Sequence, residues 1–300
     1  MRLRGLRTSL LLFALVLTAA LALALSGPGA ERTFAQDDAT ETPEPPDPAS
    51  EDPVERGRYL VRVAYTCVGC HGDETHVENP LGAALSGGGE YAGPWGLVYA
   101  ANLTQLGDWT DEQIETAIRT GVDDEGRILL PPMSYELYHS MTDDDMAAII
   151  AYLRTLEPVE NEIPEPQLPE GVDDASAVRT PPELDPDAEF PVPEDFDDPA
   201  VYGHYLAKMS SCLHCHGTVD QFGVPDPDGL PVGFIGPSLM PPAFDDWTDE
   251  ELFRLFREGV HPKQDDRPLQ VMPSYSYQYL SDDDINALIA WLRSLPAEAG

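Results

Sequence analysis

The sequence predicts an all-α protein built from two similar halves. Segments in the first half of the chain return in the second half at a nearly constant separation, which is how duplicated domains appear in a sequence. The repeated segments have apolar residues at three- and four-residue steps and carry helix start signals. No segment alternates polar and apolar residues as a half-buried strand would. We therefore expect helices in both halves, and 300 residues are enough for two domains.

Two pairs of segments define the repeat. Trp109-Thr-Asp-Glu returns 138 residues later as Trp247-Thr-Asp-Glu, and Thr142-Asp-Asp-Asp returns 139 residues later as Ser281-Asp-Asp-Asp. A threonine or serine before acidic residues is a typical helix N-cap, because its hydroxyl accepts a hydrogen bond from an otherwise unpaired amide. The pattern therefore predicts equivalent helices at equivalent places in two homologous domains.

Composition separates these domains from the rest of the chain. Residues 1–30 hold arginines followed by an apolar run, the pattern of an export signal, with a retained membrane anchor as the alternative. Residues 31–52 and 158–198 are rich in Asp, Glu and Pro, which is typical of a flexible stalk and an extended linker. The predicted domains are then 53–157 and 199–296.

The charge of the chain excludes some classes of partner. With 54 acidic and 17 basic residues the formal net charge is −37. Nucleic acids and anionic lipid head groups would be repelled by such a surface. Docking to a basic protein, or simple solubility of an exported protein, are the two explanations that the charge allows.

The four cysteines lie in two motifs of the same form. Cys67-Val-Gly-Cys70-His71 and Cys212-Leu-His-Cys215-His216 are both C-x-x-C-H. Two thiols one helical turn apart can each form a thioether with a haem vinyl group, and the histidine that follows can ligate the iron. A redox disulfide and half of a zinc site are the alternatives, but neither half supplies a second cysteine pair for zinc. Two copies in matching domains favour two covalently attached haem c groups.

The repeat also indicates a second axial ligand for each iron. Met133 and Met272 both lie nine residues before the caps Thr142 and Ser281. A thioether opposite histidine stabilises reduced iron and raises its reduction potential. A methionine in an apolar core is the alternative, and it suits the methionines that have no counterpart in the other half: Met141, Met146, Met209 and Met240.

Other polar and aromatic residues are weaker candidates. Trp109 and Trp247 could donate an indole hydrogen bond to a haem propionate, or could be ordinary core residues. Arg127 and Arg267, in the loops before the methionines, could pair with propionates or lie on the surface. The remaining histidines do not occupy matching places in the two halves, so we expect packing or surface roles for His76, His139, His204, His214 and His261.

These motifs resemble a known family, the dihaem c-type cytochromes with two class I cytochrome c domains, similar to the cytochrome subunits of membrane-bound alcohol, aldehyde and gluconate dehydrogenases. The first half carries Gly57-x-Tyr59-Leu60, Asn102-Leu-Thr and Pro131-Pro-Met in the usual order of that family, whereas the second half has Pro237-Ser-Leu in place of Asn-Leu-Thr. The resemblance implies a small helical bundle around each haem. It leaves the leader, stalk and linker unexplained.

The expected function is single-electron transfer between redox partners outside the cytoplasm, in the periplasm or on the outer face of the membrane. The partner could be a membrane dehydrogenase or oxidase, and the chain itself is expected to be an electron carrier and not an enzyme. A dihaem peroxidase or thiosulfate-oxidising cytochrome is the enzymatic alternative, but such catalysis needs an open or unusual iron ligand that the sequence does not indicate. A haem-based sensor is a third class.

Overall fold

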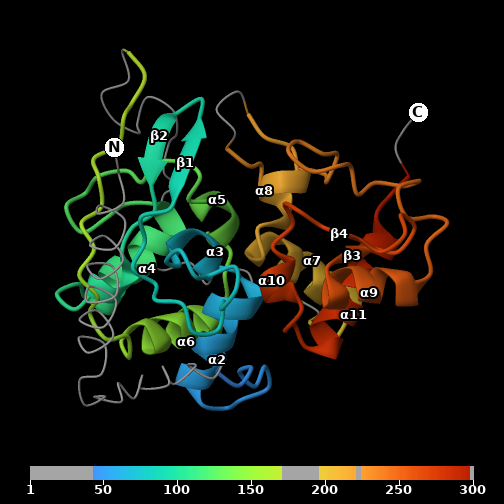
Figure 1. Cartoon of the computed structure of the whole chain (residues 1–300), viewed down its shortest axis with the longest axis horizontal. Helices are drawn as coiled ribbons and strands as arrows, with labels where there is room; N and C mark the ends of the chain where they lie inside the picture. The colour runs from blue at the N-terminus through green and yellow to red at the C-terminus, as the bar shows by residue number, and fades with distance from the viewer. Residues whose placement is uncertain (1–42, 171–195, 221–223, 298–300) are drawn as a thin grey trace, which may run out of the picture. The chain divides into compact units, whose positions relative to one another are not determined.

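The structure of the protein, a computed structural model, describes residues 43–170, 196–220 and 224–297 (Figure 1). The predicted export signal, residues 31–42 of the predicted stalk and residues 171–195 of the predicted linker lie outside these residues. Within the described ranges, no helix combines the length and the apolar character needed to cross a membrane.

Helices dominate both halves, and they follow in a similar order. The first half contains α2 (Pro53–Tyr59), the π-helical turn η1 (Leu60–Ala64), α3 (Val68–His71), β1 (Glu90–Gly93), β2 (Gly96–Tyr99), the 3-10 turn η2 (Leu103–Gln105), α4 (Asp111–Thr120), α5 (Tyr135–Tyr138) and α6 (Asp143–Leu153). The second half contains α7 (Pro199–Met209), α8 (Cys212–His216), α9 (Asp249–Glu258), β3 (Val260–His261), β4 (Arg267–Pro268), α10 (Ser274–Tyr277) and α11 (Asp282–Ser294).

The repeated Thr-Asp-Glu segments form complete capping boxes at the starts of α4 and α9. In α4 the Thr110 hydroxyl accepts from the Gln113 amide at 3.2 Å, and the Gln113 side chain accepts from the Thr110 amide at 2.7 Å. Thr248 and Glu251 make the same pair of bonds in α9. Both helices end at a glycine in the left-handed conformation, which a residue with a side chain adopts at a cost.

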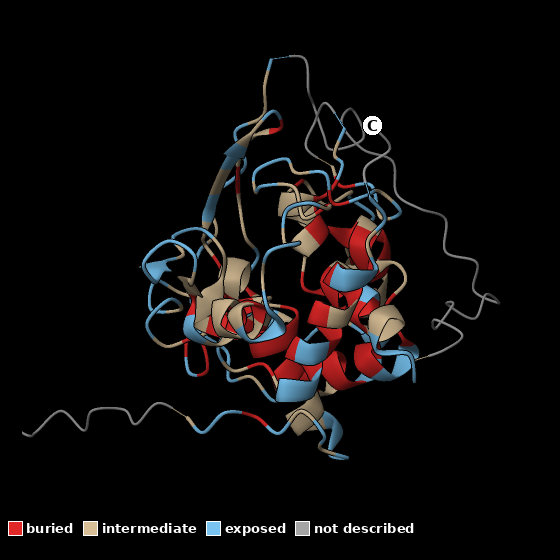
Figure 2. Ribbon diagram, turned by 90° about the vertical axis from the view of Figure 1, so that its right-hand side faces the viewer, coloured by how far each residue is buried: buried red, intermediate tan, exposed pale blue. Residues whose placement is uncertain are grey.

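In each half the first helix crosses the last helix at very short range. A Cβ at Gly57 of α2 would lie 1.9 Å from the carbonyl oxygen of Ala148 in α6, and a Cβ at Gly203 of α7 would lie 1.9 Å from that of Ala287 in α11. Only glycine allows these approaches. The apolar stripes of α6 and α11 are thereby buried against α2 and α7. Figure 2 shows buried residues gathered where helices pack together.

One inserted residue distinguishes the two first helices. Tyr59 stands eight residues before Cys67, whereas Tyr205 stands seven residues before Cys212. The first half takes up the extra residue in η1, where the amide of Tyr65 donates to the carbonyl five residues earlier at 2.8 Å. A π-helical turn is the usual result of such an insertion into a helix. Here it brings the Tyr65 ring, 1% exposed, into the core.

The two halves share one apolar core. Buried residues of α2, η1 and α6 form a continuous cluster with those of α7, α9 and α11. Hydrogen bonds also cross between the halves, because the Ser210 hydroxyl donates to the Ala64 carbonyl at 2.6 Å and the Tyr138 and Ser211 hydroxyls lie 2.9 Å apart. Each half therefore contributes to the burial of the other.

The prediction of an all-α fold needs a correction, because each half also contains a short antiparallel hairpin. β1 pairs with β2 and β3 pairs with β4. These strands have four and two residues, which is too short for a period of two to appear in the sequence. The protein is helix-rich with two small hairpins.

The first part of the predicted linker packs on the first half, and residues 159–167 are here called the strap. The Val159 carbonyl accepts a hydrogen bond from the Asn102 side chain at 2.9 Å. At the other end of the strap, Leu97 of β2 and Gln167 exchange two backbone hydrogen bonds of 3.0 and 2.8 Å. The acidic composition of this stretch predicted an extended segment but not these contacts, which use mostly backbone groups.

Candidate functional site

Both C-x-x-C-H motifs lie on one turn of helix. In α3 the His71 amide donates to the Cys67 carbonyl at 2.9 Å, so the motif is coiled as thioether attachment requires, and α8 is helical from its first cysteine to its histidine. The residue that precedes each motif, Thr66 or Ser211, has a positive φ of 51° or 57°. Non-glycine residues in this region are strained and concentrate at functional sites.

Each motif histidine is oriented by a backbone carbonyl. Nδ1 of His71 lies 2.8 Å from the Ala101 carbonyl oxygen, and Nδ1 of His216 lies 2.7 Å from that of Pro237. Because a carbonyl only accepts, Nδ1 carries the proton and Nε2 keeps its lone pair for a metal. A Cβ at Gly236 would lie 2.4 Å from the His216 ring, so glycine is needed beside it. These features fit iron-binding imidazoles.

The thiol groups also fit thioether attachment better than redox or zinc chemistry. None of the four cysteines, all of which lie in the described residues, is joined to another by a disulfide. Burial, followed by the neighbouring cysteine, raises the pKa of both Cys67 and Cys212 to about 12. A redox-active cysteine pair needs a lowered thiol pKa. Among the described residues, no group of three or more His, Cys, Asp or Glu side chains could hold a metal ion, which disfavours a zinc site of these residues.

The methionine loops lead directly into helices that reach the cysteines. Met133 and Met272 are partly buried against the core, and α5 and α10 begin two residues after them. Tyr138 and Tyr277, each five residues after its methionine, are buried beside the cysteines of their own half. Burial, followed by those cysteines, raises the pKa of each tyrosine hydroxyl. The equal placement of the two tyrosines is a signal that the sequence repeat offered and that our interpretation missed.

The first motif has a tyrosine neighbour from the β1–β2 hairpin. Tyr91 of β1 donates its hydroxyl hydrogen to the Gly69 carbonyl at 3.1 Å and lies beside Cys70. The hairpin that carries Tyr91 was not predicted, so its place at the motif could not be foreseen.

The two repeated tryptophans are anchored by arginines from the last helices. The Arg154 guanidinium donates to the Trp109 carbonyl at 2.5 Å, and that of Arg293 donates to the Trp247 carbonyl at 2.6 Å. Both indoles are partly buried against the core. These contacts explain the repeated arginines through loop anchoring, but they use the backbone carbonyl of each tryptophan and not its indole.

The two candidate arginines near the methionine loops are exposed. The Arg127 side chain is 71% exposed and pairs with Asp123 at 2.8 Å. Arg267 lies on the exposed strand β4. Their surface positions favour the surface alternative over a propionate contact.

The remaining histidines have other neighbours in the structure. Their contacts are with aromatic rings, a serine and a backbone carbonyl: His76 with Tyr275, His204 with Trp291, His261 with Trp247, His214 with Ser134, and His139 with the Arg119 carbonyl. This agrees with the packing roles expected from their unmatched places in the repeat.

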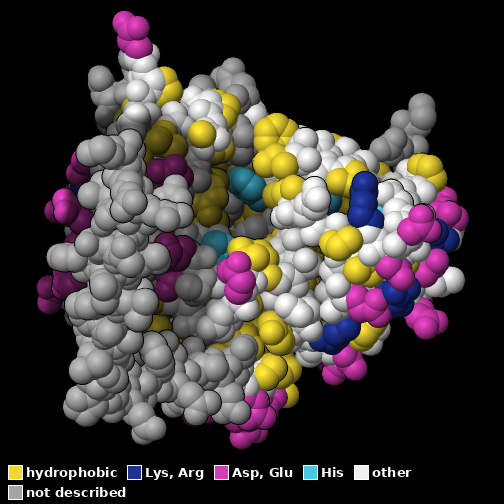
Figure 3. Space-filling model, viewed as in Figure 1, with side chains coloured by type: hydrophobic (Ala, Val, Ile, Leu, Met, Phe, Trp, Pro, Cys, Tyr) yellow, Lys and Arg dark blue, Asp and Glu magenta, His cyan; other side chains and the backbone are white. Residues whose placement is uncertain are grey.

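Histidine and hydrophobic side chains lie near one another on one face of the molecule. Figure 3 shows histidine side chains among hydrophobic side chains near the middle of this face.

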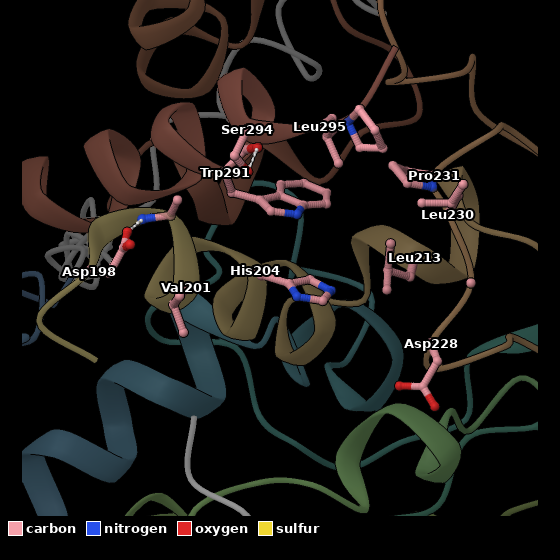
Figure 4. Close-up of a pocket in the computed structure, with 13 residues that line it drawn as sticks. Asp198, Val201, His204, Leu213, Asp228, Leu230, Pro231, Trp291, Ser294 and Leu295 are labelled. Carbon is pink, nitrogen blue, oxygen red and sulfur yellow. Dashed lines mark hydrogen bonds between the residues drawn. The ribbon is translucent and has the colours of Figure 1, made fainter. Parts of the chain in front are cut away.

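A separate cavity of about 460 Å³ lies in the second half between α7, α8 and the end of α11 (Figure 4). The His204 and Trp291 rings are nearly parallel in its wall, with centroids 6.0 Å apart. In the first half, Tyr152 stands at the position of Trp291 and accepts a hydrogen bond from the buried Arg62 at 2.5 Å. The first half therefore has the buried Arg62 side chain beside Tyr152, whereas the second half has a cavity beside the equivalent Trp291.

Comparison with protein families agrees with this geometry. Residues 54–157 match the family described as cytochrome c, and residues 200–292 match the family described as cytochrome c oxidase, cbb3-type, subunit III. Both halves are cytochrome c domains. The protein is therefore an electron-transfer cytochrome with two covalently bound haem c groups.

The chain is also similar to several curated cytochromes. It is 29% identical to the fructose dehydrogenase cytochrome subunit of Gluconobacter japonicus, over 86% of this chain and 56% of that protein. It is 29% identical to the gluconate 2-dehydrogenase cytochrome c subunit of Pantoea cypripedii, over 84% of this chain and 62% of that protein. With the diheme cytochrome c-type protein of Cereibacter sphaeroides it shares 23% identity, over 77% of this chain and 82% of that protein.

The chain spans little more than half the length of the dehydrogenase subunits that it matches. These three relatives are named as cytochromes or cytochrome subunits, which favours electron transfer over the peroxidase or thiosulfate-oxidising alternative.

Proposed function

We infer that this dihaem cytochrome accepts electrons from a membrane-bound dehydrogenase outside the cytoplasm and passes them to a second redox partner. The similarity to dehydrogenase cytochrome subunits supports the donor class. The basic and apolar pattern of residues 1–30 supports export, either with cleavage or as an anchor on the outer face of the membrane. Residues 31–52 would then be the stalk, 158–198 the linker, and 53–157 and 199–296 the two domains.

We further infer the ligands of each iron. Cys67, Cys70, Cys212 and Cys215 attach the haems, His71 and Met133 ligate the first iron, and His216 and Met272 ligate the second. The single observation that carries this proposal is the pair of Nδ1 hydrogen bonds, which direct Nε2 of His71 and His216 toward a metal. The haem iron, when bound, supplies reversible one-electron chemistry. The protein residues hold it in place and, through the methionine sulfur, favour its reduced state.

Absorption spectra of single variants test the ligands. Met133→Ala and Met272→Ala should each remove part of the red charge-transfer band that methionine gives to ferric haem, and each should lower one reduction potential. Met141→Ala, which removes a buried core methionine of the first half, is the matched control and should leave the band intact. A band unchanged in both ligand variants would contradict the assignment.

Isolation from native membranes tests the partner. The tagged full-length protein should co-purify with a dehydrogenase subunit identified by mass spectrometry, and substrate of that enzyme should reduce both haems. A complex that contains only an oxidase would place the chain elsewhere in electron transfer and would contradict the donor proposed here.

A further inference from the structure

Two buried carboxylates lie at the starts of the last helices of the two domains. Asp145 of α6 is 7% exposed and Asp284 of α11 is 4% exposed. Each is the third residue of its helix, and its amide donates to the N-cap hydroxyl of Thr142 or Ser281. Half of a capping box is therefore present in each helix.

The other half of the box is supplied by a tyrosine from the opposite domain. In α4 and α9 a Gln or Glu side chain reaches back to the N-cap amide, but aspartate is one methylene shorter. The Thr142 amide donates instead to the Tyr205 hydroxyl at 3.1 Å, and the Ser281 amide donates to the Tyr59 hydroxyl at 3.0 Å. Each domain thus completes the helix cap of the other.

The same two hydroxyls also donate to the carboxylates. Tyr205 donates to Oδ2 of Asp145 at 2.8 Å, and Tyr59 donates to Oδ2 of Asp284. Both tyrosines are almost fully buried, at 4% and 0% exposed. Because each hydroxyl accepts from an amide and donates to a charged oxygen, its position is fixed in two directions. We call these two contacts the tyrosine clasps.

The clasps connect the segments that carry the two sides of the haem sites. Tyr59 lies eight residues before the first cysteine of its own domain, and Tyr205 lies seven residues before that of its own domain. The carboxylates lie twelve residues after Met133 and Met272. Each clasp therefore ties the cysteine side of one domain to the methionine side of the other.

Two further contacts between the domains lie at the C-x-x-C-H motifs themselves. Ser134, next to Met133, lies 2.9 Å from Nδ1 of His214 inside the second C-x-x-C-H motif. In the opposite direction, a Cβ at Gly69 inside the first motif would lie 2.6 Å from the Tyr275 hydroxyl. Each methionine loop thus rests on the haem motif of the other domain.

We propose that Tyr59 and Tyr205 are positioning residues for electron transfer between the two haems, because the clasps hold the two haem-attachment motifs in a fixed relative placement. This inference rests on the electron-relay function proposed above. Electron transfer through protein falls steeply with separation, so a small shift between the domains changes its rate while the ligands of each iron stay in place.

The test removes the two hydroxyls and leaves the rings. In full-length protein with both haems attached, Tyr59→Phe, Tyr205→Phe and the double variant are compared with two matched controls. Tyr202→Phe removes a 2.8 Å hydrogen bond to Asp284 from within the second domain. Arg56→Gln removes the 3.0 Å ion pair with Asp145 from within the first domain. Both controls remove a bond to one of the same carboxylates, and each of these bonds lies within a single domain.

Two readouts separate positioning from general stability. The exciton couplet in the Soret circular dichroism reports the relative orientation of the haems without any turnover. The rate of electron equilibration after photoreduction of one haem reports their coupling. In the double variant we expect a weaker couplet and a rate lowered between about tenfold and a hundredfold, as small misplacements cause in other reactions, with both reduction potentials unchanged. The controls should keep the couplet and the rate.

Three outcomes would overturn the proposal. The first is a double variant with an unchanged couplet and rate, and the second is an equal loss in the controls. If the double variant does not fold, the single variants are compared instead, because each leaves one clasp in place. The third outcome is then a couplet and a rate that are unchanged in both single variants. If the unaltered protein shows no methionine ligation, the ligands proposed above are contradicted. The couplet comparison between variants would still test the clasps, because it does not depend on the ligand opposite histidine.

Discussion

The two domains carry the same haem motif, but the segments beside the motif differ in how far they are exposed to solvent. In the first domain β2 of the hairpin leads to Ala101, the carbonyl partner of His71, and the strap pairs with β2 at Leu97, while Val98 of the same strand is 5% exposed. In the second domain the loop that leads to Pro237 is open, and its apolar side chains are 45 to 60% exposed at Leu230, Val232, Phe234 and Ile235. The two motif histidines are therefore bonded to carbonyls in surroundings of different accessibility.

The same inequality appears in the buried carboxylates. Asp145 receives two tyrosine hydroxyls and the Arg56 guanidinium at 3.0 Å. Asp284 receives two tyrosine hydroxyls, and in the described part of the chain no Lys or Arg forms an ion pair with it. Tyr202 stands in the second domain where the first has Arg56. Both domains therefore have the buried carboxylate at the same repeat position, but the groups bonded to it differ.

The largest expected effect comes from removing one charge in each domain. Asp145→Asn should lower the free energy of unfolding by about 2 to 4 kcal/mol, because the partly buried Arg56 loses its counter-ion. Asp284→Asn should cost about 1 to 2 kcal/mol, since it weakens hydrogen bonds without stranding a cation. Urea unfolding followed by near-ultraviolet circular dichroism measures both. Arg56→Met in the Asp145→Asn background should recover part of the loss, and equal costs in the two domains would contradict the comparison.

A smaller effect is expected at the strap. Asn161 donates to the Ser86 and Gly87 carbonyls at 3.0 and 3.3 Å, so Asn161→Ala should cost about 1 kcal/mol. Amide hydrogen exchange should quicken at Leu97 and Gln167, which pair across the strap. The Leu239 amide, bonded to a carbonyl in the second domain, is the internal control. Unchanged exchange at both strap amides would mean that the strap is held by its backbone pairing alone.

The smallest expected effect is a pH dependence confined to the second domain. Burial, followed by the charge of Lys208, lowers the pKa of His204, while Asp228 acts in the opposite direction. Below about pH 6.5 the unfolded chain then binds more protons than the folded chain, so the free energy of unfolding falls as the pH falls. The first domain has Arg58 and no histidine at the same repeat position. His204→Gln should flatten the unfolding profile between pH 7 and pH 5, as measured by thermal unfolding, and an unaltered slope would contradict this origin.

Helix positions and haem motifs were predictable because their signals are local. The caps at Thr110, Thr142, Thr248 and Ser281 each need only a few neighbouring residues, and each begins a helix in the structure. The repeat selected Met133 and Met272 as candidate ligands, which remain a prediction. The spacing of eight residues in one half and seven in the other was also available as a sign of the inserted residue.

Contacts between distant segments were not predictable in the same way. Gly-x-Tyr-Leu marked Tyr59 and Tyr205 as equivalent, but equivalence does not say which domain a side chain contacts. The strap is held largely through the Val159 carbonyl and the backbone of Gln167, and composition carries no information about such groups. The hairpins were missed because their strands are too short to show a period.

The tyrosine clasps have the symmetry of a homodimer. Each domain gives the other a tyrosine and receives one in return, and such isologous pairing is how identical subunits close a two-fold interface. The chain can therefore be regarded as a pseudo-dimer within one polypeptide. Its halves differ around the shared interface, because the first has Arg56 and the strap, whereas both take part in the tyrosine exchange.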